Sequence, residues 1–543
     1  MNNLSLHIQR LIEKYQEAFL AVKSKETVAT IHVDEIASKV ASFYEKIRGV
    51  IDWKEEHLIR RTAIERVLKR RLISELPGFN LVGDLKAEGM AEPFILELIR
   101  GGHFSNDTIP QAKIKGIEAI LQKYIYVLQN SSAPNSHPKK KIQFYNWILE
   151  IAACEIEEFL APPLKESALI LAMTNIMEER IEVDSAIGLN AEEKRLQIYI
   201  AVHRSLFHLD SPIISYHLLR YWFPEWPNPT QALLDQITQN TALIWENIEG
   251  ELSYFFSNQF FKLCERYDTL YLVLSDVLEG FVNEPTEIQA QLSQPEILDG
   301  LVGRAYHKRM STLKTRLLRM AIYSTLSIFV AGGFSLFIFE VPLAKLFYGR
   351  FSPMAVLVDL LFPTILMLIL VISARLPGKS NFDKVVVEVR KIVYQNDTRN
   401  IYQVKKPKKR GVFSTFLISF LYALANLGSL ALTVWVFYLA RVPVTSIALD
   451  TINVAVVVFA GLVIRGRARE LTIEKERPSF LEFSLDILAI PIAKMGKWVS
   501  DKWKEHNVVS VFLLALVDMP FQTFVGFIES WNNFLKERKA EIH

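Results

Sequence analysis

The sequence predicts an all-α protein: a large helical cytoplasmic region, followed by a four-span transmembrane helix bundle and amphipathic interfacial helices. Two observations lead to this prediction. Apolar residues recur every three or four positions through residues 1–300, as they do on one face of a helix. Residues 317–465 then contain four apolar stretches, each long enough to cross a bilayer. The chain has 543 residues, of which 50% are hydrophobic. This average conceals the difference between the polar residues 1–300 and the apolar stretches of residues 317–465.

Charged residues mark the ends of the four predicted spans. The first span runs without a charge from residue 320 to residue 339, between Arg319 and Glu340. Its length matches the ~20 residues that a helix needs to cross ~30 Å of hydrocarbon. The other three spans are predicted near 352–374, 412–439 and 444–464.

Basic residues flank the spans on one side. Residues 300–319 carry six basic and no acidic residues, and the loop 375–410 carries eleven basic against three acidic residues. Because Lys and Arg accumulate in cytoplasmic loops, we expect both termini in the cytoplasm and the bundle in an inner (plasma) membrane of bacterial type. We expect anionic lipid headgroups to bind the basic flanks, above all at Lys405, Lys406, Lys408, Lys409 and Arg410.

The parts outside the spans are predicted to form three units. The polar, proline-containing stretch 130–141 is predicted to be a linker between a helical domain, 1–129, and a second helical region, 142–300. Residues 478–543 are predicted to form amphipathic or re-entrant helices at the membrane. A fifth span is the alternative for this last region, but it would export three basic residues against the positive-inside bias.

No motif in the sequence specifies a reaction. A phosphate-binding loop, a G-x-S-x-G elbow and an H-E-x-x-H zinc motif are all missing, so we expect no enzymatic activity, no cofactor and no metal site. A net charge of +3 on a chain of this length gives no reason to expect a nucleic-acid partner. Cys154 and Cys264 are predicted to be buried thiols rather than a redox pair.

Two groups of polar residues in the helical region remain candidates for chemistry. His203, His208, Asp210 and His217 could supply metal ligands, but the five-residue step from His203 to His208 turns a helix by about 140°, which favours surface or capping roles for the histidines. Glu155, Glu157 and Glu158 could pair with Glu178 and Glu179 as acid and base across a helical hairpin. We expect these glutamates on solvated helix faces instead.

A basic amphipathic helix is predicted over residues 57–75. Its cations could form a charged outer face, contact lipid headgroups or contact nucleic acid, and the lack of aromatic residues between them weakens the last alternative. The residues are Arg60, Arg61, Arg66, Lys69, Arg70 and Arg71.

Four polar residues lie within the predicted spans. Asp359, Asp450 and Asn453 belong to the outer halves of the second and fourth spans, and Asn426 lies near the middle of the third. A charge in hydrocarbon costs at least ~2.5 kcal/mol on insertion scales, so these groups are expected to face protein or water. A salt-bridged outer rim is the simpler interpretation, and a transport path is the alternative.

Three segments resemble those of uncharacterised multi-pass membrane proteins of small-genome bacteria: Val33-Asp-Glu-Ile-Ala-Ser-Lys, Ala63-Ile-Glu-Arg-Val-Leu-Lys-Arg-Arg71 and Phe521-Gln-Thr-Phe-Val525. The resemblance implies a membrane protein and no particular activity. We therefore expect a scaffold or recruitment protein whose helical region binds a protein partner or a second copy of the chain. A channel or transporter that uses the polar residues of the spans is the alternative function.

Overall fold

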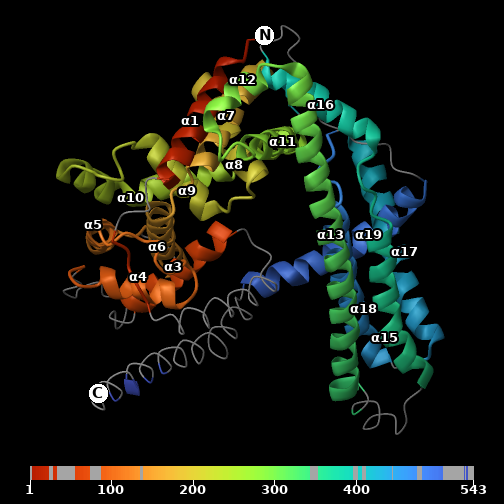
Figure 1. The fold of residues 1–543 in the computed structure, drawn as a ribbon. Helices are drawn as coiled ribbons and strands as arrows, with labels where there is room; N and C mark the ends of the chain where they lie inside the picture. The colour runs from red at the N-terminus through yellow and green to blue at the C-terminus, as the bar shows by residue number, and fades with distance from the viewer. Residues whose placement is uncertain are drawn as a thin grey trace.

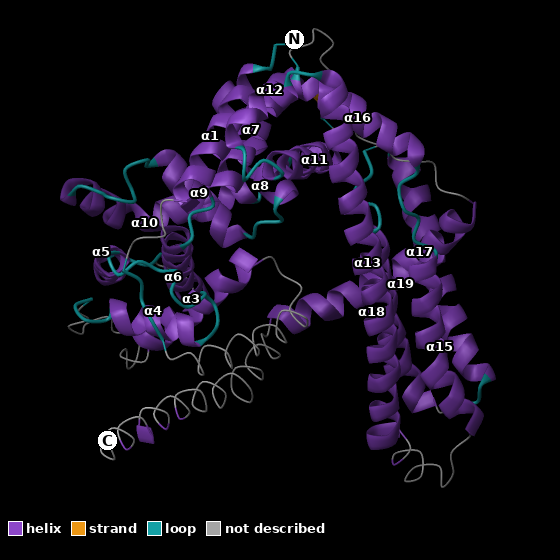
Figure 2. Cartoon of the chain, viewed as in Figure 1, coloured by secondary structure: helices purple, strands orange, loops and turns teal. Residues whose placement is uncertain are grey.

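The structure is a computed structural model that describes residues 3–23, 29–33, 56–73, 87–134, 138–340, 342, 353–394, 401–406, 411–442, 444–473 and 480–505, with isolated residues 527, 531, 534, 535 and 538. It confirms the prediction of an all-α fold (Figures 1 and 2). The helices of the helical region are α1 (Leu6–Lys23), α3 (Glu56–Ile73), α4 (Ala91–Arg100), α5 (Lys113–Asn130), α6 (Pro138–Leu160), α7 (Leu164–Arg180), α8 (Ala191–Leu206), α9 (Ser211–Trp222), α10 (Gln231–Leu252), α11 (Ser257–Glu279) and α12 (Ile288–Leu292).

The second half of the chain forms a bundle of long helices beside this region. Figure 1 shows α13 leaving the helical region and running down the bundle. Its helices are α13 (Pro295–Ser335), α15 (Pro353–Ile372), α17 (Val412–Leu439), α18 (Val444–Arg467) and α19 (Phe480–Glu505), and α16 (Lys379–Val393) lies between α15 and α17 in the chain.

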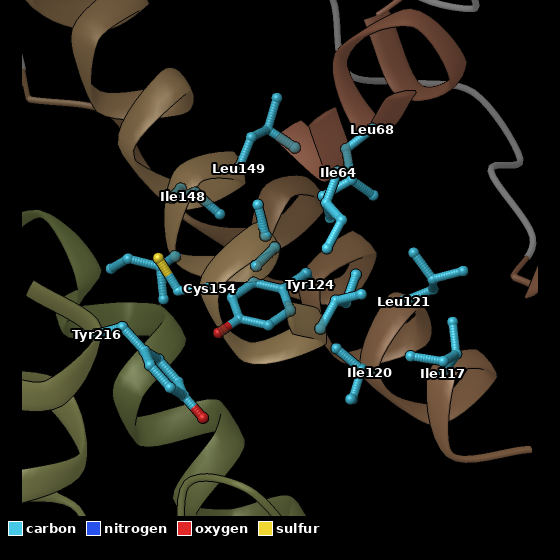
Figure 3. Close-up of a cluster of buried hydrophobic side chains, with 14 of the residues drawn as sticks. Ile64, Leu68, Ile117, Ile120, Leu121, Tyr124, Ile148, Leu149, Cys154 and Tyr216 are labelled. Atoms are coloured by element: carbon cyan, nitrogen blue, oxygen red, sulfur yellow. The ribbon is translucent and has the colours of Figure 1, made fainter. Parts of the chain in front are cut away.

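Two apolar cores hold the helical region together. The first combines side chains from α3, α4, α5, α6, α9 and α10, and Figure 3 shows its centre, where Ile64, Leu121, Leu149 and Tyr216 come from four different helices. The second combines α1, α7, α11, α12, α16 and the first half of α13. Helix α8 contributes to both cores. The predicted linker 130–141 does not separate these cores, because α5 before it and α6 after it pack together in the first one.

Helix α13 belongs to the helical region and to the bundle at once. Leu298, Val302, Tyr306 and Met310 are buried in the second core at the three- and four-residue spacing of one helix face. From Leu318 onward most of the large apolar side chains of this helix are exposed, whereas Met320 and Ile328 are half-buried against α15 and α18. The same helix therefore packs against protein in its first half and presents apolar surface to its surroundings in its second half.

The chain returns to the second core twice after α13. Helix α16 buries Val385 and Val389 there, and the segment after α18 buries Leu471 and Ile473. Strand β2 (Tyr402–Val404) also pairs in parallel with strand β1 (Ile181–Val183). The predicted basic loop 375–410 thus contains a helix and a strand that are part of the helical region.

A buried asparagine ties these returning segments to α13. Asn381 of α16 donates hydrogen bonds to the Tyr306 hydroxyl at 3.0 Å and to the Leu471 carbonyl at 2.7 Å. Its side-chain oxygen accepts a hydrogen bond from the Ile473 amide at 2.9 Å. Since a buried polar group costs free energy unless it is hydrogen-bonded, these bonds allow three distant segments to meet at one place.

Among the described residues, three helices are long and apolar enough to cross a membrane, not the predicted four: Pro295–Ile338, Val412–Leu439 and Ile447–Arg467. They include the predicted first, third and fourth spans. The predicted second span is α15, whose apolar part, Val356–Ile372, is shorter than these three. By length and composition alone, the four-span prediction is therefore supported only for three helices.

Helix α19 packs along α18. Gly496 lies so close to the α18 backbone that a Cβ atom there would be 2.0 Å from the Ala455 carbonyl oxygen. Ten residues earlier in α19, Asp486 accepts a hydrogen bond from buried Arg465 of α18 at 2.7 Å. The start of the predicted C-terminal unit, 478–543, is therefore a helix docked on the bundle. Most of residues 506–543 lie outside the described residues.

Candidate functional site

A polar cavity of about 490 Å³ lies in the helical region between α3, α6, α7 and α9. Its polar lining includes Arg60, Arg61, Glu157, Glu158 and His217. Its apolar lining consists of Ala161, Pro162, Pro163, Ile170, Phe207, Leu209 and Ile213.

Local sequence explains why these elements meet at the cavity. Helix α6 ends at Leu160 because Pro162 and Pro163 come directly afterwards and proline cannot continue a helix. Asp210 then caps the N-terminus of α9 by accepting a hydrogen bond from the Ile213 amide. The last turn of α6 and the first turns of α7 and α9 therefore all line the cavity.

Two adjacent arginines of α3 form one wall of the cavity. Arg60 donates to Glu157 of α6 at 2.7 and 2.9 Å. Arg61 is 6% exposed and bridges Glu65 at 2.9 Å and Asp210 at 2.6 Å. Because a buried charge is tolerated only when it is paired and hydrogen-bonded, these contacts fix α3 against α6 and α9.

A chain of hydrogen bonds connects the cavity with the protein interior. The fully buried His203 lies 2.8 Å from the Tyr199 carbonyl through Nδ1 and 3.1 Å from His217 Nδ1 through Nε2. A carbonyl only accepts, so Nδ1 of His203 carries its proton and Nε2 accepts a hydrogen bond from His217. His217 Nε2 lies 2.5 Å from the Glu158 carboxylate, which also accepts from Arg220 at 2.9 Å.

With Glu158 ionised, both ring nitrogens of His217 are placed to donate hydrogen bonds, Nδ1 to His203 and Nε2 to the carboxylate. Burial alone would raise the pKa of Glu158, but His217 and Arg220 outweigh it and lower that pKa. Burial lowers the pKa of His203 well below its ordinary value. His217 and Glu158 therefore form a hydrogen-bonded pair at the cavity wall.

At two other glutamates of α6, burial prevails over the neighbouring cations and raises the pKa. It raises the pKa of Glu157 to about 7 against the lowering effect of Arg60, and it raises the pKa of Glu150 to about 7. It also raises the pKa of the Cys154 thiol well above its ordinary value. A protonated thiol is a poor nucleophile, so the cavity is better suited to binding a polar group than to covalent catalysis.

The structure corrects two expectations from the sequence. His203 is not a surface residue, because it faces His217 across the contact between α8 and α9. The glutamates of α6 do not lie on a solvated face or pair with Glu178 and Glu179. Glu155 is buried, where it accepts hydrogen bonds from Lys123 and Tyr124.

The sequence contained no signal for which residues pair around the cavity. The partners lie up to about 150 residues apart, as Arg61 and Asp210 do. Glu178 pairs with Arg195, and Glu179 lies 2.9 Å from His7. Within the described residues, no group of three His, Cys, Asp or Glu side chains is placed to hold a metal ion.

The basic helix α3 is directed largely toward its own domain. Arg61 is buried, Lys69 pairs with Glu65 at 2.7 Å, and Arg70 and Arg71 both pair with Glu97 of α4. These contacts leave less of the helix for the predicted lipid headgroups, and Arg61 in particular is not on the surface. Arg66 is half-buried on the same helix.

The basic residues before α17 were predicted to bind the same headgroups. Lys405 and Lys406 are exposed beside β2, where Lys406 donates to the Ala186 carbonyl at 3.5 Å, and their contact with headgroups stays a prediction. Lys408, Lys409 and Arg410 lie outside the described residues.

Of the four polar residues predicted within the spans, two are buried in the bundle. Asp359 of α15 is 7% exposed and Asp450 of α18 is 2% exposed. Asn426 donates to the Tyr422 carbonyl of its own helix, and Asn453 is exposed. The predicted cluster is therefore reduced to its two aspartates.

The register of α15 and α18 relates these aspartates to each other. The two helices touch where Gly461 approaches Leu370, since a Cβ atom on Gly461 would lie 2.8 Å from that side chain. Asp359 precedes Leu370 by eleven residues, and Asp450 precedes Gly461 by eleven. Eleven residues are about three helical turns, so both aspartates lie on the contacting faces at the same level when the helices run in the same direction.

Comparison with protein-family models, curated proteins and solved structures finds no match to this chain. The resemblance to multi-pass membrane proteins of small-genome bacteria therefore stays a prediction. Function has to be inferred from the cavity, the buried aspartates and the way in which the helical region joins the bundle.

The raised pKa of Glu157 predicts a pH-dependent effect of replacing it. The folded protein holds this proton to about pH 7, whereas an unfolded glutamate loses it near pH 4.3. The contribution of the protonated Glu157 to the free energy of unfolding is therefore fully present below the unfolded pKa. It is lost as the pH rises through about 7. Glu157→Gln should thus gain stability relative to the wild type between pH 5.5 and 7.5, by on the order of 1–2 kcal/mol.

Thermal unfolding of the full chain in detergent at both pH values measures this effect. Glu166→Gln removes an exposed carboxyl from the rim of the same cavity and is the matched control. A difference between Glu157→Gln and the wild type that is the same at both pH values would contradict the assignment.

Proposed function

We propose that this protein is a membrane-anchored recruitment protein, in which a multi-pass bundle holds the helical region beside a bilayer and that region binds a partner. The observation that carries the proposal is the continuity of α13, which is buried in the second core up to Leu313 and belongs to an apolar candidate span from there on. A continuous helix transmits orientation as well as distance. A partner bound to the helical region would therefore be presented to the membrane in one fixed arrangement.

The second core also supports a four-span topology. Residues from before α13, from α16 and from the segment at Leu471 and Ile473 all pack in this core, so they lie on one side of the bilayer. If α13 crosses, the chain has to return before α16, and α15 is the described helix that can return it. Its apolar stretch, Val356–Ile372, has 17 residues, the lower limit for a spanning helix. Helices α17 and α18 then form the second pair.

The basic flanks favour the cytoplasm as this common side. The positive-inside bias of residues 300–319 and 375–410 supports cytoplasmic termini in a plasma membrane. In this arrangement the helical region stays in the compartment where it is synthesised, and α19 docks on the cytoplasmic end of α18 through Arg465 and Asp486.

The polar cavity is the recognition site that we propose for the partner. It combines an apolar floor with charged groups that are already oriented by ion pairs, as small binding sites in proteins do. Glu166 and Ser167 lie exposed at its rim. A partner protein, or a second copy of this chain, could insert a polar side chain there without rearranging the walls.

A photo-crosslinking amino acid at Ser167, at the rim, tests this proposal in native membranes. We expect one reproducible adduct, identified by mass spectrometry, that is missing when the same group replaces Asn283. Asn283 is an exposed residue that does not line the cavity. Identical neighbours at both positions, or none at Ser167, would contradict recruitment through the cavity.

Transport is a second candidate function, favoured by the two buried aspartates. Asp359 and Asp450 lie at the same level on the contacting faces of α15 and α18 if these helices run in the same direction, as the four-span topology requires. Ionisable residues inside a membrane bundle are costly and often belong to ion or proton paths.

Flux assays on the full chain in liposomes test the transport function. If it is correct, proton or cation flux should fall at least about tenfold in both Asp359→Asn and Asp450→Asn, because each change removes a charge that stabilises the moving cation. Asn453→Ala, at an exposed position of α18, is the control and should retain flux. The absence of wild-type flux above that of empty liposomes would reject transport of the ions tested.

A further inference from the structure

The wall of the polar cavity presents one carboxylate oxygen that is open to a ligand. Glu157 is 6% exposed, and Arg60 donates to it through Nε at 2.9 Å and through a terminal nitrogen at 2.7 Å, both times to Oε1. Its Oε2 has no hydrogen-bond partner among the described residues, and it is not enclosed by protein, so it opens on the cavity. An ionised carboxylate only accepts hydrogen bonds, so a ligand at this position has to bring a donor.

A second carboxylate lies at the rim of the cavity. Glu166, in the first turn of α7, is exposed and forms no ion pair with any described residue. The neighbouring Lys165 does not neutralise it, because that lysine pairs with Glu279 of α11 at 3.5 Å. Glu166 is near enough to Glu157 for its charge to raise the pKa of Glu157. The two carboxylates therefore form one acidic position that extends from the wall to the rim.

The arginines of the cavity wall do not compensate this acidic position. Burial prevails over Arg60 and raises the pKa of Glu157 to about 7, so one cation does not offset the cost of burying the carboxylate charge. Arg61 is already shared between Glu65 and Asp210. A further cation beside Glu157 would therefore be favoured electrostatically.

An anion fits the same cavity poorly, because the donors of the wall are used within the protein. Arg60 is held by Glu157, and His217 is placed to donate to Glu158. Arg61 has one nitrogen without a partner among the described residues, Nε, but this atom is enclosed by protein, so a ligand in the cavity does not reach it. The wall thus offers acceptors to a ligand rather than donors.

The rest of the wall is apolar and suits the stem of a long side chain. Its large apolar residues come from α7, α9 and the connections before them: Pro162, Pro163, Ile170, Phe207, Leu209 and Ile213. Lysine and arginine bury their methylene stems along such surfaces while their charged heads reach polar groups. A cavity of about 490 Å³ is in the size range of small-molecule sites, so it admits one such side chain.

We infer that the cavity recognises a basic side chain of the partner, whose guanidinium or ammonium group binds Glu157 and Glu166 while its aliphatic stem packs on the apolar wall. The contacts expected are charge-assisted hydrogen bonds to Glu157 Oε2 and to the Glu166 carboxylate. This inference rests on the proposed recruitment function, because it names the group that the cavity receives from the partner.

Ligand-observed NMR titrations of the full chain in detergent test the inference with capped amino acids at pH 8, above the pKa of Glu157. The probes are the Nα-acetyl amides of arginine and lysine, each paired with a neutral counterpart of similar shape, citrulline or Nε-acetyllysine. We expect the basic member of at least one pair to bind about tenfold or more tightly than its counterpart, because charge-assisted hydrogen bonds are about twice as strong as neutral ones. Equal affinities within both pairs would overturn the inference. So would a glutamate probe that binds more tightly than its glutamine counterpart.

Variants test whether this preference arises in the cavity. Glu157→Gln/Glu166→Gln should abolish the preference, and circular dichroism would verify its fold. Glu166→Gln alone, at an exposed position, should lower the preference by about threefold, since exposed ion pairs contribute little, and it decides the test if the double variant does not fold. Glu246→Gln, which removes an exposed carboxylate of α10 outside the cavity, is the matched control and should leave the preference unchanged. A preference that survives in the double variant, or that falls equally in Glu166→Gln and the control, would overturn the site.

The outcome is separable from that of photo-crosslinking at Ser167. A preference for basic probes without a partner adduct would retain the cation site and reject recruitment through the cavity. An adduct without such a preference would retain recruitment and reject the basic side chain.

Discussion

One helix, α13, packs against two different surroundings, and the rest of the structure depends on how the chain meets this condition. Its first half buries apolar side chains in the second core of the helical region, and its second half belongs to a candidate membrane span. If α13 crosses a bilayer, a chain that packs again in the same core has to return to the same side of it. The structure returns it through α16, β2 and the residues after α18, and Asn381 holds the first and last of these to α13 with three hydrogen bonds.

The same need to satisfy buried polar groups shapes the cavity. Arg60, Arg61 and His217 come from α3 and α9, and each is paired with a carboxylate on another element of the cavity wall. Removing one partner of such a pair would leave a buried charge unpaired, which costs more than the pair contributes. Ion pairs of this kind fix the relative positions of the helices, so the cavity keeps its shape without a ligand. A preformed site binds with a smaller loss of conformational entropy.

The helices and the apolar spans could be predicted from the sequence because both follow from local spacing. The three- and four-residue period predicted α6 and α8, and long apolar runs predicted α17, which is free of charges, and α18, which contains Asp450 near its start. The cavity could not be predicted in this way. Its pairs join residues that are about 60 to 150 positions apart, such as Glu158 with His217 and Arg61 with Asp210, and no local pattern encodes which helices meet. Residues 130–141 were predicted to be a linker because of their polar composition. Such a composition indicates a loop, but it does not show whether the helices on either side share one core, as α5 and α6 do.

The fixed connection between the helical region and the bundle is tested most directly by a distance distribution between spin labels. Leu171 of α7 and Tyr438 of α17 are exposed and suited to labelling, in a chain whose buried Cys154 and Cys264 are replaced by serine. Double electron–electron resonance in lipid nanodiscs should give a single narrow distribution, because a continuous α13 and the second core hold both labels in one body. A broad or multimodal distribution would show a hinge near residues 314–320, and it would contradict the account.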